Sequence, residues 1–439
     1  MGIRAWGRAA LRSAALVLAL ASAVPAAVRA QGQAAPLPVI HVDNGPNSPA
    51  AQKAHYVVLV SLDGFRWDYA KKIGARHLLA LGRRGVWAPE GMLPSYPSLT
   101  FPNHYAIATG LYPEHNGLVA NGFYDPERNA RFAIADDKAV TDGSWYNGVP
   151  LWSLAESQGM RSACFFWPGS EARIAGYQPT YFLHFDNKID DNARIDQVIA
   201  WLKLPEADRP HFITLYYSEP DHEGHQFGPD APETKAAVLK VDGLIGKLKS
   251  GLDATHLPID LVVVSDHGMI KTEGGWVTLD QFADLSAFET AGTMLYGKTE
   301  EDRARVYNQL KKASEKFVAY RRKDVPAGLN YSQNPREGDP VIVLTGPYAV
   351  RAHAPAAGTE DRAPTAGMHG LDPRKFPEMK ASFFAEGPDI AAGKTVVPFE
   401  NVNLYPWIAH LLGLRAPKSD GSLNILAGTL RDGGAEQGQ

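Results

Sequence analysis

The strongest constraint on the fold is a set of short apolar runs, each of which stops abruptly at polar or turn-forming residues. The runs are rich in β-branched or aromatic side chains and do not alternate with polar ones: Tyr56–Leu62, Arg161–Trp167, Phe212–Tyr217 and Ile259–Val264. Such runs are typical of strands buried on both faces of a parallel sheet. Helix-like stretches separate them at Tyr69–Arg84, Asp190–Leu204 and Thr234–Ser250. We therefore predict an α/β fold with a doubly wound, mostly parallel sheet and helices on both faces.

The remaining segments define the expected domain organisation. Residues 31–54 are rich in Ala, Pro, Gly and Asn without periodicity and are predicted to be a linker, and residues 431–439 a flexible tail. One main domain would then span residues 55–430. Residues 288–351 break the alternation, with an amphipathic helix expected at Glu300–Arg321 and a strand at Pro340–Leu344. We predict an inserted α+β lobe there.

The first thirty residues have the pattern of a secretory signal peptide. They contain four arginines and no acid, with an apolar run at Ala14–Ala21 and small residues after it. This run is shorter than the ~20 residues that a spanning helix needs, so cleavage is favoured over an uncut membrane anchor. We expect an exported chain without a stable membrane anchor, suited to a bacterial periplasm. Cys164 is the single cysteine, which excludes an intramolecular disulfide framework and multi-cysteine metal sites.

The net charge of −4 offers no basic surface for a nucleic-acid duplex. Nothing in the sequence indicates an oligomeric state.

Residues that commonly bind metals come shortly after three of the predicted strands, and one more lies in a loop further along the chain. They are Asp63, Asp221, His225, Asp266, His267 and His369. Because the carboxyl ends of parallel strands share one edge of a sheet, these side chains are expected to converge. A mixed aspartate and histidine set without cysteine suits Zn²⁺, or else Mn²⁺, and six residues suffice for two three-ligand sites.

Each of these residues alone has an ordinary structural explanation. Asp63-Gly64 is a common turn signal, and Asp221 with His225 four residues later could be a pair on one helix face. His222 is the nearest alternative to His225. The prediction therefore depends on several strand ends carrying ligand-type residues together.

Thr100 is the candidate nucleophile. Prolines precede it, Pro102 suits the first turn of a helix, and Gly110 is placed to end that helix. Thr100 would then lie at or next to a helix N-terminus, where backbone amides favour a bound phosphate. A threonine that only caps the helix is the alternative.

Five sequence blocks, in order along residues 55–415, resemble the nucleotide pyrophosphatase/phosphodiesterase family of the alkaline phosphatase superfamily. They are Ser61–Arg66, Pro97–His104, Glu219–Pro229, Ser265–Met269 and Gly367–Gly370. The resemblance implies an alkaline-phosphatase-like fold and two zinc ions, one held by Asp63, Thr100, Asp266 and His267 and the other by Asp221, His225 and His369. It also implies a covalent phosphothreonine at Thr100 and a phosphate contact from Asn121, although Asn121-Gly122 is also a turn signal.

The expected substrate is a small nucleotide phosphodiester or pyrophosphate. Phe101, Tyr181 and Tyr216 could form an aromatic slot for a base, although the tyrosines could equally be core residues. No arginine adjoins Thr100 to bind a dianionic monoester, which favours diesters. A phosphomonoesterase and a lipid-headgroup phosphodiesterase of the same superfamily stay open, as does a periplasmic metal- or nucleotide-binding protein without turnover. The sequence around Cys164 lacks the Cys-x-Pro-x-Arg pattern of a sulfatase.

Overall fold

A computed structural model describes residues 36–356 and 358–431 of the chain. The predicted signal peptide, the first part of the predicted linker and residues 432–439 of the predicted tail lie outside the described residues. In the described part, no helix has both the length and the apolar character needed to cross a membrane.

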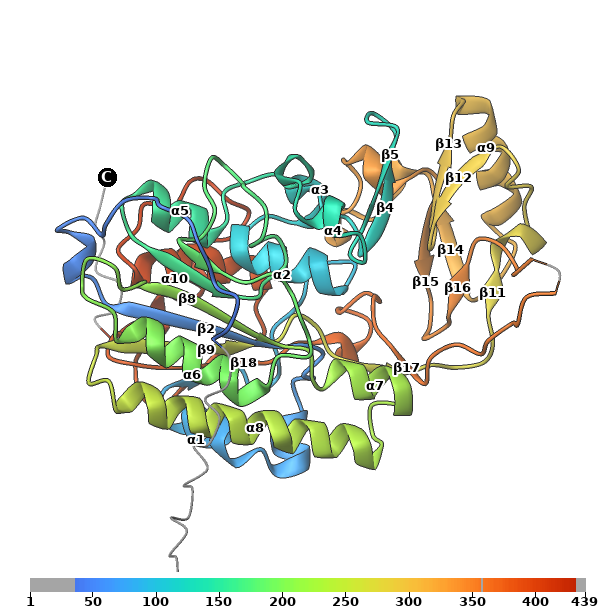
Figure 1. Ribbon diagram of the computed structural model, residues 1–439. Coiled ribbons are helices and arrows are strands. Elements are labelled where there is room, and N and C mark those ends of the chain that lie inside the picture. Colours follow the sequence, from blue (N-terminus) through green and yellow to red (C-terminus); the bar gives the residue numbers. More distant parts are fainter. Residues whose placement is uncertain (1–35, 357, 432–439) are drawn as a thin grey trace, which may run out of the picture. The chain divides into compact units, whose positions relative to one another are not determined.

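A nine-stranded sheet forms the centre of the described chain (Figure 1). In spatial order its strands are β1 (Ile40–His41), β7 (Tyr181–Phe182), β6 (Ser162–Phe165), β8 (Phe212–Tyr217), β2 (Tyr56–Leu62), β9 (Ile259–Val264), β18 (Phe383–Glu386), β3 (Val86–Trp87) and β19 (Lys394–Thr395). The five strands from β7 to β9 are parallel, whereas β1 and β18 pair antiparallel with their neighbours. The predicted α/β class is confirmed, with a mixed sheet.

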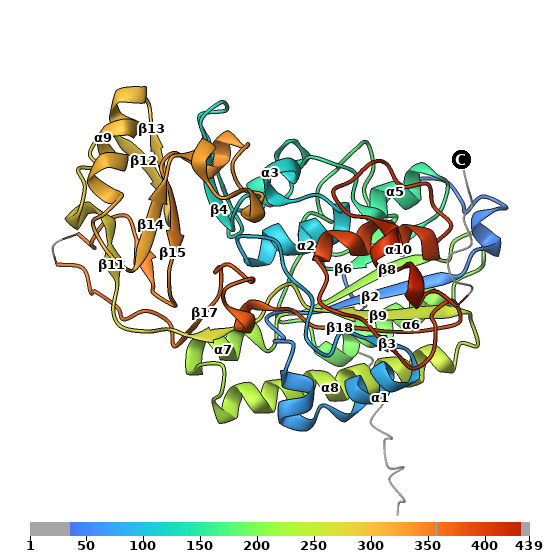
Figure 2. The ribbon, with the colours of Figure 1, turned by 180° about the vertical axis from the view of Figure 1, so that it is seen from behind.

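The predicted central strands occur because their side chains are apolar on both sides. All residues of β2 and β8 are buried, and the bounds of β2, β8 and β9 coincide with the apolar runs. Helices cover both faces (Figures 1 and 2): α1 (Arg76–Arg84), α6 (Asp191–Leu202) and α8 (Pro232–Asp253) on one, and α2 (Thr100–Thr109), α5 (Leu151–Ser157) and α10 (Leu404–Leu411) on the other.

Two predicted helices differ from the structure. The stretch Tyr69–Arg84 is divided into a π-helical turn, Ala70–Gly74, and α1, because Gly74 adopts a left-handed φ of 88° that no helix continues through. The helix expected at Glu300–Arg321 ends at Leu310 (α9, Glu300–Leu310).

Phe317–Tyr320 instead forms strand β14, which pairs antiparallel with β15 (Val341–Leu344). Strand β15 lies within the predicted strand Pro340–Leu344. The side chains of β14 are alternately buried and exposed up to Ala319, which is the period of a strand.

The predicted linker is partly wrong. Ile40–His41 joins the central sheet as β1, and the buried Asn47 donates to the carbonyls of Glu206 and Arg209 while its Oδ1 accepts from the amide of Arg161. This segment is therefore fixed by specific hydrogen bonds, which leave no periodic signal in the sequence.

The inserted lobe has its own hydrophobic core, and that core extends from Val277 to Ala352, beyond the expected 288–351. Its paired strands are β11 (Val277–Thr278) with β16 (Val350–Arg351), β12 (Phe288–Ala291) with β13 (Met294–Gly297), and β14 with β15. The lobe leaves the core of the fold after β10 (Ile270–Lys271) and returns at β17 (Gly367–Met368), and these two strands pair antiparallel.

Candidate active site

Strand register brings the predicted carboxylates together. Leu62 at the end of β2 pairs with Tyr217, and Ser61 pairs with Val264, so the residues that follow the three strands meet at one edge of the sheet. Asp63 and Asp266 lie directly at this edge and are buried.

Asp221 begins α7 (Asp221–Phe227), and its amide donates to the carbonyl of Asp63 at 3.1 Å. Gly64 allows this approach, because a Cβ there would lie 2.8 Å from the Cβ of Asp221 and the residue has a φ of 64°.

Histidines from three different segments complete two groups of possible metal ligands. His225 lies one turn after Asp221 on α7, and its Nε2 is 3.5 Å from Asp221 Oδ1 and 3.0 Å from the Nε2 of His369. The Nε2 of His267 lies 3.5 Å from Asp63 Oδ1 and 2.9 Å from Asp266 Oδ2. The rings of His267 and His369 stack with centroids 3.6 Å apart, so the two groups are adjacent.

Backbone carbonyls fix the orientation of these three histidines. Nδ1 of His225 donates to Gly367, that of His369 to Ser98 and that of His267 to Gly268, each at 2.9 Å. Because a carbonyl only accepts, the proton of each neutral ring is on Nδ1 and the Nε2 lone pair points toward the carboxylates. Metal-binding histidines characteristically donate their other ring N–H to a carbonyl or carboxylate in this way.

The electrostatics of the carboxylates indicate that a cation belongs among them. Burial raises the pKa of Asp63 well above its ordinary value, and the neighbouring Asp266 and Asp221 raise it further. Burial also opposes ionisation of Asp266, and it is the positive charge of His267 and His104 in their protonated forms that holds its pKa below the ordinary range. One buried oxygen of each of the three aspartates has no hydrogen-bond partner. Lone pairs and unpartnered carboxylate oxygens that face one another fit bound divalent metals.

Thr100 is the first residue of α2, as predicted, and lies beside the ligand groups. Its hydroxyl is 3.4 Å from His267 Nε2. Asn121 is close by, because its Oδ1 accepts a hydrogen bond of 2.9 Å from the amide of Phe101. This contact fixes the Asn121 side chain and leaves its amide nitrogen to donate elsewhere.

His104 is a site residue that the sequence analysis did not identify. It is fully buried, its Nδ1 contacts the Thr100 carbonyl at 2.9 Å and lies 3.4 Å from Asp266 Oδ2, and its Nε2 is 2.8 Å from the hydroxyl of Ser61. The available signal was its position four residues after Thr100, which places both on one face of α2. His104 therefore couples the start of α2 to the ligand groups.

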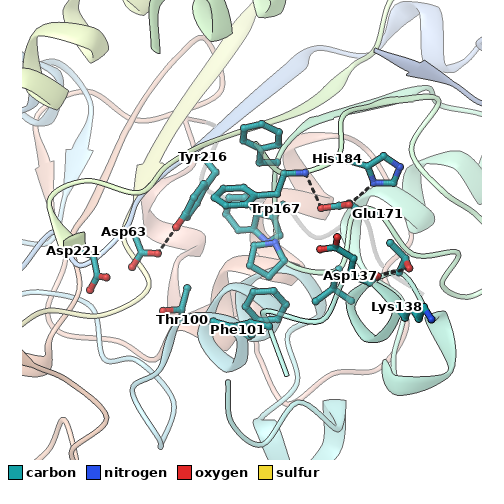
Figure 3. A pocket seen from close by; sticks show the side chains of 17 residues that line it. Asp63, Thr100, Phe101, Asp137, Lys138, Trp167, Glu171, His184, Tyr216 and Asp221 are labelled. Carbon is teal, nitrogen blue, oxygen red and sulfur yellow. Dashed lines mark hydrogen bonds and ion pairs between the residues drawn. The ribbon is translucent and has the colours of Figure 1, made fainter. Parts of the chain in front are cut away.

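A cleft of about 620 Å³ opens from the ligand groups (Figure 3). Asp63, Asp221 and Thr100 lie at one end, and the rings of Phe101 and Tyr216 line it beyond them. The Tyr216 hydroxyl donates to Asp63 Oδ2 at 2.6 Å.

The far part of the cleft is formed by residues that the sequence analysis did not single out. Apolar and aromatic ones include Phe166, Trp167 and Phe185, and polar ones include Asp137, Lys138, Glu171 and His184. Glu171 accepts from the Phe185 amide and pairs with His184 Nδ1 at 2.5 Å, which fixes this wall.

Two candidates from the sequence lie elsewhere. Tyr181 on β7 stacks with His41 and Trp201, and its hydroxyl contacts Arg161 and the Asp208 carbonyl, so it does not line the cleft. The prediction that Tyr181 belongs to the aromatic slot is therefore wrong.

His222, the alternative to His225, is exposed and belongs to none of the ligand groups found among the described residues.

A further cluster, separate from the site, contains His55, Asp260 and Asp389. Asp260 is fully buried, with Oδ1 accepting from the Asp389 amide and Oδ2 without a partner. Burial raises the pKa of Asp260 to about 8.

Comparisons with known proteins agree on one family. The family model described as type I phosphodiesterase / nucleotide pyrophosphatase matches residues 57–372. An uncharacterised pyrophosphatase/phosphodiesterase of Schizosaccharomyces pombe is 34% identical over 83% of this chain and 78% of its own length. Human ectonucleotide pyrophosphatase/phosphodiesterase family member 1 is 34% identical over 87% of this chain but only 43% of its own length. A venom phosphodiesterase of Crotalus durissus collilineatus is 35% identical over 86% of this chain and 47% of its own length, so the chain spans under half of these two relatives.

Solved structures show the same similarity. Murine ectonucleotide pyrophosphatase/phosphodiesterase 5 superposes with a TM-score of 0.80 at 28% identity, covering 86% of this chain and all of that one. An inactive variant of that protein in complex with AMP superposes with a TM-score of 0.79.

Proposed function

The chain belongs to the type I phosphodiesterase/nucleotide pyrophosphatase family, and on this premise we propose that it hydrolyses nucleotide phosphodiester or pyrophosphate bonds and releases nucleoside monophosphates. The observation that carries the proposal is the juxtaposition of the Thr100 hydroxyl with two groups of metal-ligand side chains at the mouth of an aromatic cleft. The AMP bound by the related murine protein supports a nucleotide as substrate.

The proposal includes two zinc ions. Asp63, Thr100, Asp266 and His267 would hold one, and Asp221, His225 and His369 the other. Ligand atoms of Asp221, His225 and His369 lie within 4.8 Å of one another, and so do those of Asp63, Asp221 and His267. When bound, the metals would lower the pKa of the Thr100 hydroxyl and neutralise charge that develops on the phosphate.

Thr100 is proposed as the nucleophile. A bond forms between Thr100 Oγ1 and phosphorus while the bond from phosphorus to the leaving oxygen breaks, and that oxygen takes up a proton. Water then cleaves the phosphothreonine and releases the nucleoside monophosphate. Asn121 would donate from its free amide nitrogen to a phosphate oxygen, and the base would lie between Phe101 and Tyr216 in the cleft.

The lining of the cleft favours a diester over a monoester. Among the described residues it contains no arginine, and Lys138 lies at the end away from Thr100 (Figure 3). A monoester carries one more negative charge on the transferred phosphoryl group than a diester does. The nitrophenyl ester of thymidine 5′-monophosphate should therefore be hydrolysed faster than nitrophenyl phosphate, and the reverse order would identify a phosphomonoesterase.

Substitution of Thr100 tests the mechanism directly. Thr100→Ala should abolish hydrolysis while metal analysis still finds close to two zinc ions per chain, because the other ligands remain. Thr100→Ser keeps a hydroxyl in the same place and should retain measurable turnover. Full activity in Thr100→Ala would contradict the nucleophile assignment.

Export to the periplasm is part of the same proposal. It is supported by the basic and apolar pattern of residues 1–30 and by relatives that are named ectonucleotide and venom enzymes. N-terminal sequencing of the chain recovered from the periplasmic fraction would test it, and an intact Met1 there would contradict cleavage.

A further inference from the structure

A second cleft, of about 360 Å³, lies between the catalytic core and the inserted lobe. The core contributes the segments around Pro97 and Asn121, and the lobe contributes the turn between β12 and β13, strand β15 and the residues around Tyr348. Trp276, at the entry to the lobe, also lines it. The position of this cleft follows from the way the lobe packs beside the core.

This second cleft reaches the candidate active site from another side. Asn121 and His369 line it, while Thr100, Asp63 and Asp221 line the first cleft, and none of the described residues lines both. The Asn121 side chain stands at the partition, because its Oδ1 is bonded to the amide of Phe101, which belongs to the first cleft. The two clefts therefore meet at the place where the phosphate would lie.

The walls of the second cleft suit a flat, uncharged group. Apart from His369, no titratable histidine, acid or base lines it among the residues that the structure describes. Trp276 is 38% exposed, yet its indole nitrogen is fixed by a 2.8 Å hydrogen bond to the Arg362 carbonyl. The Arg351 guanidinium lies 5.3 Å from the centre of the Trp276 ring and is paired with Asp361, so it is not available to an anion in the cleft.

The geometry of displacement at phosphorus indicates which half of a substrate each cleft would hold. The entering and leaving oxygens must lie roughly in line on opposite sides of phosphorus. Thr100 enters beside Asp63 and His267, so the leaving group departs toward the other ligand group, of which Asp221 lines the first cleft and His369 lines the second. The nucleoside that stays on phosphorus occupies the first cleft.

We infer that the second cleft binds the leaving nucleoside of a dinucleotide, with its base against Trp276 and Tyr348. This inference rests on the proposed function and specifies its substrate class. The reaction is attack of Thr100 Oγ1 on the bridging phosphorus with departure of the 3′ oxygen of the leaving nucleoside, which takes up a proton. Hydrolysis of the phosphothreonine then consumes one water and releases the second nucleotide as its 5′-monophosphate. A pyrophosphate leaving group, as in ATP, would meet no lysine or arginine among the described residues that line this cleft.

Two substrates that leave the same AMP on the enzyme test the inference. They are adenylyl-(3′→5′)-adenosine, whose leaving group is adenosine, and ATP, whose leaving group is pyrophosphate. Since loss of an aromatic platform under a base weakens binding by about tenfold or more, Trp276→Ala should lower kcat/KM for the dinucleotide about tenfold and that for ATP less than twofold. Phe185→Ala, in the first cleft, should lower kcat/KM for both substrates by the same factor. Val397→Ala, at an 81% exposed position outside both clefts, controls for the substitution itself.

A binding measurement separates stacking from an effect on turnover. Adenosine titrated into the Thr100→Ala enzyme saturated with AMP should bind, and addition of Trp276→Ala should weaken that binding about tenfold. Equal effects of Trp276→Ala on both substrates, or unchanged adenosine binding, would overturn the inference while leaving the proposed function intact. Failure of the unsubstituted enzyme to hydrolyse either substrate would instead refute the function and the inference together.

Discussion

The hydrogen bond between Tyr216 and Asp63 gives the sharpest test of the metal assignment. Asp63 Oδ1 faces His267 and has no hydrogen-bond partner, while Oδ2 is bonded to the Tyr216 hydroxyl at 2.6 Å. Both side chains are at least nine-tenths buried. The tyrosine therefore orients one oxygen of the carboxylate so that the other would be presented to the proposed metal.

Tyr216→Phe removes this donor and keeps the ring that lines the cleft. A hydrogen bond to a charged group contributes about 1.5–3 kcal/mol, and about 1.4 kcal/mol corresponds to a factor of ten. Zinc affinity should thus fall between about tenfold and about a hundredfold, which is the range typical when a metal ligand loses the hydrogen-bond partner that orients it. In excess zinc, kcat/KM should return close to that of the unsubstituted enzyme, because Thr100 and the cleft are unchanged.

The assay is zinc content per chain after equilibration with a graded series of chelator concentrations. Tyr217→Phe is the matched control, since this neighbour donates to the Asp191 carbonyl at 3.3 Å and lines neither cleft. Its chelator midpoint should not move. An unchanged midpoint for Tyr216→Phe would refute the orienting role, and activity that excess zinc fails to restore would show that the hydroxyl acts on the substrate.

Two further predictions concern the turn after β2 and the buried acid on β9. Gly64→Ala should lower kcat/KM at least tenfold, because its Cβ would displace Asp221, whereas Gly45→Ala, at a φ of 84° with no atom within 4 Å, should cost only about 1 kcal/mol of stability. Equal loss of activity in both variants would contradict this. Burial raises the pKa of Asp260 from 3.8 to about 8, so the folded state holds a proton that the unfolded state has already lost. The free energy of unfolding should therefore fall as pH rises from about 4 to about 8. Asp260→Asn cannot ionise and should flatten the fall of Tm between about pH 4 and pH 8; parallel Tm profiles would contradict the shift.

The interior of the fold was predictable because its signals are local. The runs Tyr56–Leu62, Phe212–Tyr217 and Ile259–Val264 coincide with β2, β8 and β9, since burial on both faces requires uninterrupted apolar residues. Short strands such as β18 were not predicted. Four residues carry too little pattern, and pairing with β9 and β3 decides their conformation.

The residues of the site also divide into those that local patterns predict and those that depend on distant contacts. The positions of Asp63 and Asp266 follow from strand ends, and His225 from the period of a helix. The position of His369 depends on its bond to the Ser98 carbonyl, a contact 271 residues distant that no local pattern records.

The aromatic residues of the cleft were harder still to assign. A strand buried on both faces does not reveal which face meets the cleft, so Tyr181 was included and Trp167 was overlooked.

The pairing of β10 with β17 has a consequence for how such a protein can change over evolution. The lobe leaves the core just after Ile270 and returns just before Met368, and these two residues face each other across an antiparallel ladder. The two ends of the inserted lobe are thus held together by the core, so a longer, shorter or unrelated segment could replace the lobe at little entropic cost of loop closure. His267 and His369 lie outside that segment, whereas much of the second cleft lies within it. A lineage could therefore exchange the module that selects the departing half of a substrate while inheriting the reaction chemistry unaltered.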